Sequence, residues 1–372
     1  MRKTVGIITF HGSFNYGSML QAYALQQVVT RLGYECEIIN FRTQKQKDFY
    51  RPSFLRGRWL GRIKRTILYF PYLFQLLAKQ RCFKDFMMNN LKLSAKEYAT
   101  LQELEYANLH YDYYISGSDQ IWNTHCFDFD WAYFLPFVKS GKKIAYAPSM
   151  GPLPDVEVAT SNEEQIKRLI ASYDFISVRE AGTANRIGEF IENEYQTVLD
   201  PTLLLDKELW MKMAGDKALV NGDYILLYTP WYDEKTFSVA ARLAEKMKLK
   251  VVVTQMYDGN VNHWLYKSDY KPYLATGPIE FLNLCKYATC IIGNSFHLAV
   301  FSVMLNKSFY IVNGMSDSRV SNLLRMTGLE NRSVNEDESF TAINWDIDFV
   351  TAHRLLEAEK QRSLKWIKDC LK

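Results

Sequence analysis

The chain has 372 residues, a length that suggests two domains, each able to bury its own core. Hydrophobic residues make up 48% of it and charged residues 23%, which is typical of a globular protein and excludes a disordered or collagen-like chain. No apolar run reaches the about 18 residues that a bilayer-spanning helix needs. The six cysteines form neither Cys-x-x-Cys pairs nor a Cys/His metal spacing, so we expect small buried side chains in a reducing cytoplasm.

The first half of the chain alternates between strand and helix patterns. Residues 5–10 predict a strand rather than a secretion signal, because no small-residue cleavage site follows them. A helix over 18–32 and a strand over 37–41 complete a βαβ unit, whose first loop lies where parallel sheets bind ligands. Further elements are expected as helices at 101–109 and 180–190 and as strands at 113–116, 143–147, 175–178 and 196–199.

The second half begins where Asp200-Pro201 interrupts this pattern, and a connection over 207–221 follows. Further elements are expected as strands at 224–228, 250–254, 289–292 and 309–312 and as helices at 234–248, 279–287, 296–305, 319–326 and 349–371. We therefore predict an α/β fold of two Rossmann-like parallel-sheet domains that face a cleft, at residues 1–205 and 206–345. The last helix, within 346–372, is expected to pack back on the first domain.

A basic and aromatic insertion, about residues 42–90, interrupts the first domain. From Arg42 to Lys84 there are 12 Lys or Arg and one acid, Asp48, so this segment carries +11 and leaves −7 for the rest of a chain whose net charge is +4. Two interpretations stay open: a helix that lies on an anionic membrane, or the solvated basic face of a packed helical insertion. Nucleic acid is not expected as a partner, because the rest of the chain is acidic and carries no recognition motif.

The run from Thr289 to Phe301 passes from an apolar β-branched strand, across small polar residues, into a helix whose first turn carries His297. Such a corner leaves backbone N–H groups free at the positive end of a helix dipole, which predicts a phosphate site. A lone histidine often only caps or packs a helix. Here apolar residues surround it, so His297 is the only titratable group of this helix.

Several segments, in order along the chain, resemble the polysaccharide pyruvyl transferase family. They are Phe14-Asn15-Tyr16-Gly17-Ser18-Met19-Leu20-Gln21-Ala22-Tyr23-Ala24-Leu25, Gly117-Ser118-Asp119-Gln120-Ile121-Trp122-Asn123, Ile176-Ser177-Val178-Arg179-Glu180 with Val198-Leu199-Asp200-Pro201, and Asn294-Ser295-Phe296-His297 with Lys307-Ser308-Phe309-Tyr310-Ile311-Val312. Each motif is weak alone, but their order and spacing over about residues 5–330 make the resemblance strong.

The resemblance implies a GT-B-like architecture and a transferase with phosphoenolpyruvate as co-substrate and no other cofactor. Such an enzyme moves the enolpyruvyl unit onto a sugar diol, giving a pyruvate ketal and phosphate during surface polysaccharide biosynthesis. The acceptor would be a sugar or a lipid-linked oligosaccharide. We expect a cytoplasmic protein, peripheral on the inner membrane face if the segment from Arg42 to Lys84 binds an anionic membrane surface.

The donor's carboxylate and phosphate need cations and N–H groups. Arg179, at the end of an apolar strand, could hold either group with a bidentate fork, or could pair structurally with Glu180 or another acid. His297 is the best general acid, for the departing phosphate or for the methylene carbon. In the resemblance, Arg319 stands near a Lys of many members and Ser295 stands where an Arg is common. The expected donor-binding residues are Arg179, Asn294, Ser295, His297, Ser318 and Arg319.

The acceptor hydroxyl needs a base, and Asp119 follows a strand at the expected cleft. An Asp two residues after a Gly serves equally well as the cap of a turn or helix, so both roles stay open. The loop at Asn15 lacks the Gly-x-Gly-x-x-Gly spacing, which argues against a dinucleotide. The predicted catalytic residues are His297, Asp119 and Arg179, and the predicted acceptor-binding residues are Asn15, Tyr16, Gly17, Ser116, Gln120 and Asn123.

Two Asp-x-Asp triplets, 128–130 and 346–348, have the form that binds a divalent metal in some nucleotide-sugar transferases. Neither follows a convincing strand, so both are predicted to be surface turns and no metal is expected. Two other functions remain open. A nucleotide-sugar glycosyltransferase of GT-B architecture would need an acid late in the second domain to hold a ribose, for which Glu330 is the near candidate. A non-catalytic carbohydrate-binding protein would not need both Arg179 and His297.

Overall fold

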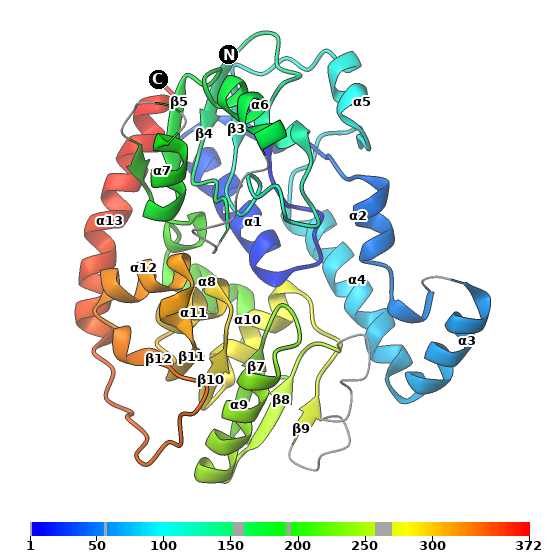
Figure 1. The fold of residues 1–372 in the computed structure, drawn as a ribbon, viewed down its shortest axis with the longest axis vertical. Helices are drawn as coiled ribbons and strands as arrows, with labels where there is room; N and C mark the ends of the chain where they lie inside the picture. The colour runs from blue at the N-terminus through cyan, green and yellow to red at the C-terminus, as the bar shows by residue number, and fades with distance from the viewer. Residues whose placement is uncertain (1, 56–57, 152–159, 190, 192–194, 257–269) are drawn as a thin grey trace.

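The computed structural model describes residues 2–55, 58–151, 160–189, 191, 195–256 and 270–372, and contains two parallel sheets (Figure 1). The predicted fold class is therefore confirmed. Arg56 of the insertion and Phe190, the expected end of a helix, lie outside the described residues. Within those ranges, no helix combines the length and the apolar composition needed to cross a membrane.

The first sheet has the strand order β2-β1-β3-β4-β5-β6, and every neighbouring pair is parallel. Its strands are β1 (Thr4–Ile8), β2 (Glu35–Ile38), β3 (Tyr113–Ser116), β4 (Lys142–Ala145), β5 (Phe175–Val178) and β6 (Gln196–Thr197). Strands β3 and β5 have the predicted bounds, because each is a short, mostly apolar run with a strand paired on either side.

The second sheet has the order β12-β11-β10-β7-β8-β9 and is also parallel throughout. Its strands are β7 (Tyr224–Tyr228), β8 (Lys250–Val253), β9 (Tyr270–Pro272), β10 (Cys290–Gly293), β11 (Phe309–Val312) and β12 (Ser333–Val334). The sequence did not predict β9 and β12, which have three and two residues and so carry almost no periodic signal.

Helices fill the connections between these strands. They are α1 (Tyr16–Arg31), α2 (Gln44–Phe49), α3 (Trp59–Leu68), α4 (Leu73–Asn90), α5 (Leu101–Tyr106), α6 (Thr160–Ile170), α7 (Ala181–Gly188), α8 (Lys207–Ala214), α9 (Glu234–Met247), α10 (Pro278–Tyr287), α11 (Phe296–Met304), α12 (Ser318–Thr327) and α13 (Phe349–Cys370). Short 3-10 helices are η1 (Ser53–Leu55), η2 (Phe70–Tyr72), η3 (Trp131–Phe134), η4 (Pro201–Leu203), η6 (Gly314–Ser316) and η7 (Glu330–Arg332).

Local chemistry explains where the structure departs from the predicted bounds. Helix α1 begins two residues early, because the side chain of Asn15 accepts hydrogen bonds from the N–H groups of Gly17 and Ser18. Helix α8 replaces the predicted connection and buries Trp210, whose ring packs against Phe301 of α11. A helix of only one or two turns has too few residues for its periodicity to distinguish it from a loop.

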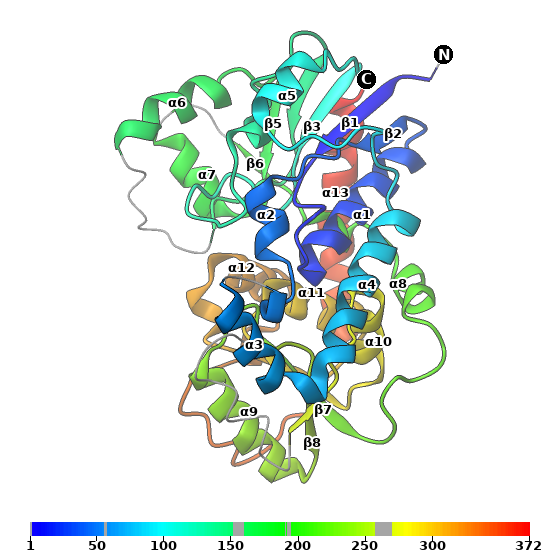
Figure 2. The same cartoon turned by 90° about the vertical axis from the view of Figure 1, so that its right-hand side faces the viewer.

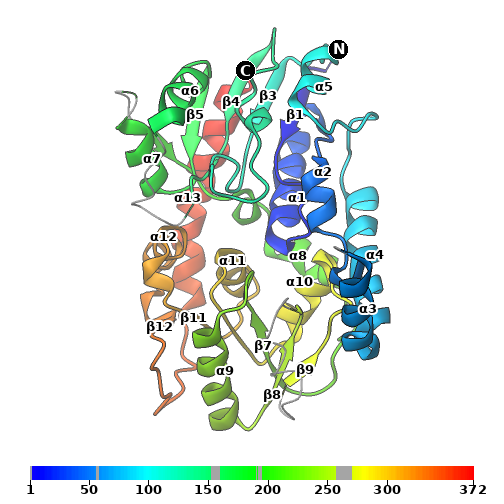
Figure 3. The same cartoon turned by 45° about the vertical axis from the view of Figure 1, so that its right-hand side comes forward.

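Two long helices join the halves of the molecule on opposite flanks, α13 on one side and α4 on the other (Figures 1 and 3). On α13, the Ser363 hydroxyl accepts from the N–H of Leu199, and Trp366 contacts the ring of Tyr146 in the first domain. On α4, Gln75 accepts from the N–H of Leu274 in the second domain. One hydrophobic core also contains side chains of both sheets, so the two halves pack directly against each other.

Candidate active site

Charged side chains converge between the two sheets, at the carboxyl ends of their strands. Asp119 follows β3, Arg179 follows β5 and Asp200 follows β6, while His297 follows β10 of the other sheet. All four are at least nine-tenths buried. Because the carboxyl ends of parallel strands meet at one edge of a sheet, residues far apart in the chain reach the same place.

Arg179 is surrounded by carboxylates. Its Nη1 lies 3.1 Å from Asp200 Oδ2 and 3.6 Å from Asp119 Oδ1, and its Nε lies 3.4 Å from Glu180 Oε2. Its guanidinium carbon is 4.9 Å from the ring centroid of Phe296 on α11. Burial alone would lower the pKa of Arg179, but the charges of Glu180, Asp200 and Asp119 outweigh burial and raise the pKa.

This arrangement changes the predicted role of Arg179. A bidentate grip on a ligand needs two nitrogens, but Nε and Nη1 are already engaged by Glu180 and Asp200. Nη2 is buried and has no hydrogen-bond partner among the described residues. The structural pairing with acids is therefore present, and one nitrogen remains for a ligand.

Asp200 connects the arginine to the histidine. Its Oδ2 lies 3.5 Å from His297 Nε2, and its Oδ1 accepts from the N–H and the hydroxyl of Thr202. Burial would raise the pKa of Asp200, but His297 and Arg179 lower it further than burial raises it. Asp200 belongs to one of the motifs that carry the family resemblance, but it was not predicted as a site residue. An Asp-Pro pair directly after a strand was the available signal.

His297 is in the first turn of α11, as expected. The N-cap residue Ser295 makes no side-chain capping bond, so its hydroxyl satisfies none of the N–H groups of the first turn. A Cβ added to Gly17 would lie 2.0 Å from His297 Nδ1. The glycine of the first motif therefore makes room for the histidine of the last one.

Other predicted donor residues lie nearby with different partners. Asn294 donates from Nδ2 to Asp233 Oδ2 at 3.1 Å, while its Oδ1 is buried without a partner among the described residues. Arg319 donates to both oxygens of Asp317, at 3.0 Å from Nε and 2.5 Å from Nη2. Arg319 and Arg179 line the same small cavity of about 20 Å³. Ser318 is the first residue of α12, whose N-cap is Asp317.

Asp119 is within the cluster, and its two oxygens already accept hydrogen bonds. Oδ2 accepts from the Ser18 hydroxyl at 2.6 Å, and Oδ1 accepts from the N–H of Gln120 at 2.9 Å. The capping role that the sequence left open is thus present for one oxygen. Ser18 follows Gly17 in α1, so Asp119 is connected to the same helix terminus as His297.

The predicted acceptor residues do not all lie in one place. Asn15 caps α1 and lines a cavity between the domains. Tyr16 is buried, with its ring 4.6 Å from that of Phe281 in the second domain, so it packs at the junction of the two halves. Gln120 and Asn123 are half-buried and bond to each other at 3.0 Å.

Ser116 is not brought to this place by the structure. Its side chain is fully buried, and its hydroxyl donates to the carbonyl of Tyr133 inside the first domain. A residue of β3 itself, rather than of the loop after it, points into the core of a sheet that is covered on both faces. We therefore assign Ser116 to packing.

The triplet at 128–130 is not the surface turn that was predicted. Asp128 is half-buried, and its Oδ2 accepts from the hydroxyls of Ser13 and Tyr50 at 2.8 and 2.6 Å. Burial raises the pKa of the Asp128 carboxyl above its ordinary value. Asp130 caps the first turn of η3 by accepting from the N–H of Ala132. The two carboxylates therefore serve separate local bonds.

In the triplet at 346–348, Asp346 is exposed and Asp348 caps α13 through the N–H of Thr351. Glu330 is exposed and follows the carboxyl end of α12, whereas Ser318 is at its amino end. Ten helical residues span about 15 Å, so Glu330 is distant from the cluster. The candidate that a nucleotide-sugar enzyme would need is therefore badly placed.

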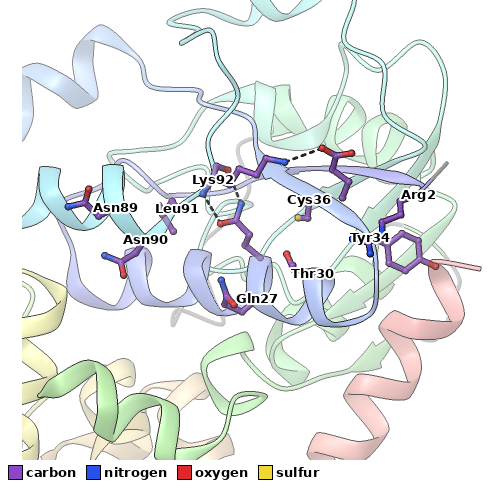
Figure 4. Close-up of a pocket in the computed structure, with 11 residues that line it drawn as sticks. Arg2, Gln27, Thr30, Tyr34, Cys36, Asn89, Asn90, Leu91 and Lys92 are labelled. Atoms are coloured by element: carbon purple, nitrogen blue, oxygen red, sulfur yellow. Dashed lines mark hydrogen bonds and ion pairs between the residues drawn. The ribbon is translucent and has the colours of Figure 1, made fainter.

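A hollow of about 640 Å³ has another lining, which Figure 4 shows. It is lined by residues such as Arg2, Glu35 and Cys36, at or before the amino ends of β1 and β2. Lys92 forms an ion pair with Glu35 at 3.2 Å there. Because the charged cluster is at the opposite edge of the sheet, we assign no part of the site to this hollow.

The family model described as polysaccharide pyruvyl transferase matches residues 15–314. No curated protein sequence matches the chain. Among solved structures, it is similar to UDP-N-acetylglucosamine 2-epimerase from Rickettsia bellii, with 8% identity, a TM-score of 0.57 and coverage of 99% of this chain and 96% of that one. It is also similar to S. aureus MnaA with UDP, with 13% identity, a TM-score of 0.56 and coverage of 100% and 97%. At such identities, the likeness shows the GT-B fold alone.

Proposed function

The chain belongs to the polysaccharide pyruvyl transferase family, and we propose that it moves the enolpyruvyl unit of phosphoenolpyruvate onto two hydroxyls of one sugar. The product is a pyruvate ketal on a sugar of a growing surface polysaccharide. The observation that carries this proposal is the buried cluster of Arg179, Asp200 and His297 between the two sheets. It joins a cation, a proton carrier and a helix terminus at one point.

The proposed reaction sets definite demands on these groups. One sugar hydroxyl adds its oxygen to the central carbon of phosphoenolpyruvate, while a proton adds to the methylene carbon and makes it a methyl group. The second hydroxyl then replaces the phosphate at the same carbon, and its proton leaves with the phosphate. A proton carrier is thus needed near both the methylene and the phosphate oxygen.

His297 meets that demand in this proposal. Its Nε2 is buried without a hydrogen-bond partner among the described residues and lies 3.5 Å from Asp200 Oδ2, so this nitrogen is available to exchange a proton with a ligand. The amino end of α11 would supply N–H groups to the phosphate. Arg179 Nη2 and Arg319 would bind the donor's negative groups.

Asp119 is the proposed base for the acceptor hydroxyl. The Ser18 hydroxyl donates to it at 2.6 Å, so the acceptor proton reaches Asp119 either directly, after this bond breaks, or through Ser18. Either route places the sugar beside the start of α1, where Asn15 and Gly17 lie. The acceptor and donor sites would then share one helix terminus.

We also propose that the protein works in the cytoplasm at the inner membrane face. The large apolar side chains of Trp59, Ile67, Phe70 and Phe74 are 68, 71, 68 and 83% exposed, and all lie on α3, η2 or the start of α4. Exposed Arg58, Arg62 and Lys64 lie beside them. Interleaved cations and apolar side chains favour a helix on an anionic lipid surface.

Some of the cations in the insertion are paired with acids. Glu97, outside the segment, pairs with Arg42 at 3.6 Å and with Lys47. Asp48 pairs with Arg51 at 3.2 Å. The charge of its first part is thus partly compensated by these two acids, and the proposed lipid contact is confined to α3, η2 and the start of α4.

The proposal is tested by ligand-dependent thermal stability together with turnover. We expect phosphoenolpyruvate to raise the melting temperature, and nucleoside diphosphates without a sugar to leave it unchanged. Phosphate release from phosphoenolpyruvate should then depend on a sugar acceptor. Stabilisation by nucleoside diphosphates alone, with none by phosphoenolpyruvate, would favour the nucleotide-sugar glycosyltransferase.

A further inference from the structure

A cavity of about 340 Å³ lies where the insertion meets the second domain. Residues of α2, of α4 and of the segment that leads from β7 to α9 line it. Figures 2 and 3 show where these elements lie in the fold. Its lining is aromatic with a few polar groups, namely Phe14, Tyr50, Lys79, Trp231, Tyr232 and Gln255. The volume and the mixed lining are typical of a site for one small organic group.

The cavity adjoins the charged cluster on both sides. Asn15 lines it, and Gly17, two residues later, contacts His297. On the other wall, Tyr232 lines it and Asp233 bonds to Asn294, three residues before His297. The cavity is therefore connected to the proposed donor site through two separate chain segments, one in the first domain and one in the second.

Lys79 is the unusual group in this cavity. Its ammonium donates to the hydroxyl of Tyr16 at 2.9 Å and to the carbonyl of Thr254 at 2.9 Å. No carboxylate within the described ranges pairs with it, and burial lowers its pKa to about 7. A half-buried cation without a counter-ion is costly unless a ligand supplies the negative charge.

We propose that this cavity binds the acceptor as a glycosyl diphosphate, with the sugar against Trp231 and Tyr232 and a phosphate on Lys79. Sugar C–H faces pack on aromatic rings, and Trp231 is 66% exposed, so its ring is accessible. This inference rests on the proposed function, because it assigns the acceptor of the same site. It makes Lys79 a specificity-determining residue.

The proposal predicts that the affinity for the diphosphate depends on pH. At pH 8 the free Lys79 amine is mostly neutral, so binding of a phosphate diester must take up one proton. Affinity should then fall about tenfold per pH unit above 7, while a diphosphate diester itself does not titrate there. Tyr16, Thr254 and Cys82 also face Lys79, and Tyr50, Arg51 and Tyr232 face the cavity.

Those neighbours do not supply the same pH dependence. Burial raises the pKa of Cys82 to about 11, and burial also raises the pKa values of Tyr50 and Tyr232 above their ordinary range. Arg51 is paired with Asp48 at 3.2 Å, and guanidinium groups do not lose their proton in this pH range. Lys79 is therefore the group expected to titrate between pH 6 and 9.

The experiment measures binding by calorimetry to the full chain between pH 6 and 9. The probes are UDP-N-acetylglucosamine, farnesyl-diphospho-N-acetylglucosamine and methyl N-acetylglucosaminide, the last of which lacks phosphate. We expect the parent to bind a diphosphate probe with the tenfold slope and to bind the methyl glycoside about 10- to 100-fold more weakly. Preference for the farnesyl probe identifies a lipid carrier, and preference for the UDP probe a nucleotide carrier.

Matched variants assign the effect to the ammonium. Lys79→Met should weaken diphosphate binding about 10- to 100-fold and remove the pH slope. Lys84→Met removes the same charge from an exposed position of α4 and should retain both. If Lys79→Met does not fold, Trp231→Ala at its exposed site serves instead and should weaken all three probes.

Three results would overturn the inference: no binding of either diphosphate, equal affinity for the methyl glycoside, or a parent-like pH slope in Lys79→Met. Failure of the proposed function is seen separately. In that case phosphoenolpyruvate would not stabilise the parent protein, whatever the glycosyl diphosphates do. Retention of phosphoenolpyruvate stabilisation in Lys79→Met would locate any loss in the acceptor site.

Discussion

The arginines of this molecule work in two opposite environments. Arg179 is buried between the sheets with three carboxylates within 3.6 Å. Arg58 and Arg62 are exposed on and beside α3, have no carboxylate within 4 Å among the described residues, and lie next to exposed Trp59 and Ile67. One region has an excess of acid around its cation, and the other has an excess of cation around apolar side chains.

The difference shows how burial and neighbours, rather than residue type, decide what a cation does. A buried guanidinium is stable only when counter-charges and hydrogen bonds replace water, so it orders the groups around it. An exposed one on a helix with apolar neighbours stays hydrated and is available to an external anionic surface. A substitution in one of these regions therefore leaves the other region as an internal reference.

The largest effect is expected from His297→Ala, which removes the proposed proton carrier. Turnover should fall about 100- to 10,000-fold, because general-acid catalysis is worth that much. The side chain is in the first turn of α11 and is not part of the hydrophobic cores, so the melting temperature should change little. Full activity, or an unfolded variant, would contradict the assignment. Rate and melting curves together make the measurement.

Gly17→Ala tests the same contact from the other side. The new Cβ would lie 2.0 Å from His297 Nδ1, so the imidazole must move away from Asp200. Turnover should fall by at least about tenfold, since small displacements at a reacting centre are costly. Gly188→Ala is the control, because a Cβ there meets nothing within 4 Å.

The next effect is expected on the exposed region. Reversing Arg58, Arg62, Lys64 and Arg65 to Glu should weaken binding to anionic vesicles by about 1000-fold or more, since each cation near such a surface is worth about 1 kcal/mol. Turnover of a soluble sugar acceptor should persist. Vesicle flotation at low and high salt is the measurement, and binding should weaken with salt. Equal binding by parent and variant would reduce the segment to ordinary packing.

A smaller effect is expected from Arg179→Lys, which retains the charge but loses the planar fork. A lysine ammonium carries its three N–H groups on one atom and cannot reproduce the separate guanidinium nitrogens that face Glu180, Asp200 and a ligand. The Michaelis constant for phosphoenolpyruvate should therefore rise about tenfold or more. Stability should fall as well, because buried acids lose donors. Arg186→Lys is the control, since its pair with Glu189 at 3.9 Å is near the surface. An unchanged Michaelis constant would make Arg179 purely structural.

The sequence predicted much of the fold because its signals are local. Tyr224–Tyr228 and Phe309–Val312 are fully buried strands whose apolar runs have the predicted ends. The capping geometry of Asn15 shifted α1 by two residues, which periodicity does not report. The fold class needed only the alternation of such elements along the chain.

The site was predicted less completely, because its residues come from distant parts of the chain and meet only in the folded protein. Asp200 and Lys79 acquire roles only when β6 lies beside β5 and when α4 reaches the second domain. Neither has a sequence neighbour that reveals its partner. Ser116 shows the converse error, since a residue next to a motif can face the core. Motif position therefore predicts the neighbourhood of a site but not the direction of each side chain.

The smallest effect is expected from removing divalent metal ions, which tests whether the buried region needs one. Asp119, Glu180 and Asp200 around Arg179 leave an excess of negative charge that a divalent ion would cancel. Their oxygens, however, already accept from other groups: Asp119 from Ser18 and Gln120, Glu180 from Thr183, and Asp200 from Thr202. The guanidinium of Arg179 cancels one of these three negative charges.

We therefore expect turnover to change less than about twofold after complete chelation and gel filtration, since Arg, His and a helix terminus already neutralise a phosphate. Phosphate release, assayed with and without added manganese, is the measurement. A strict requirement that manganese restores would identify the acidic excess as a metal site. It would also make Asp128 and Asp130 candidate metal ligands and favour a nucleotide-sugar glycosyltransferase. Activity without metal would instead leave the arginine, the histidine and the acids as one self-neutralising unit.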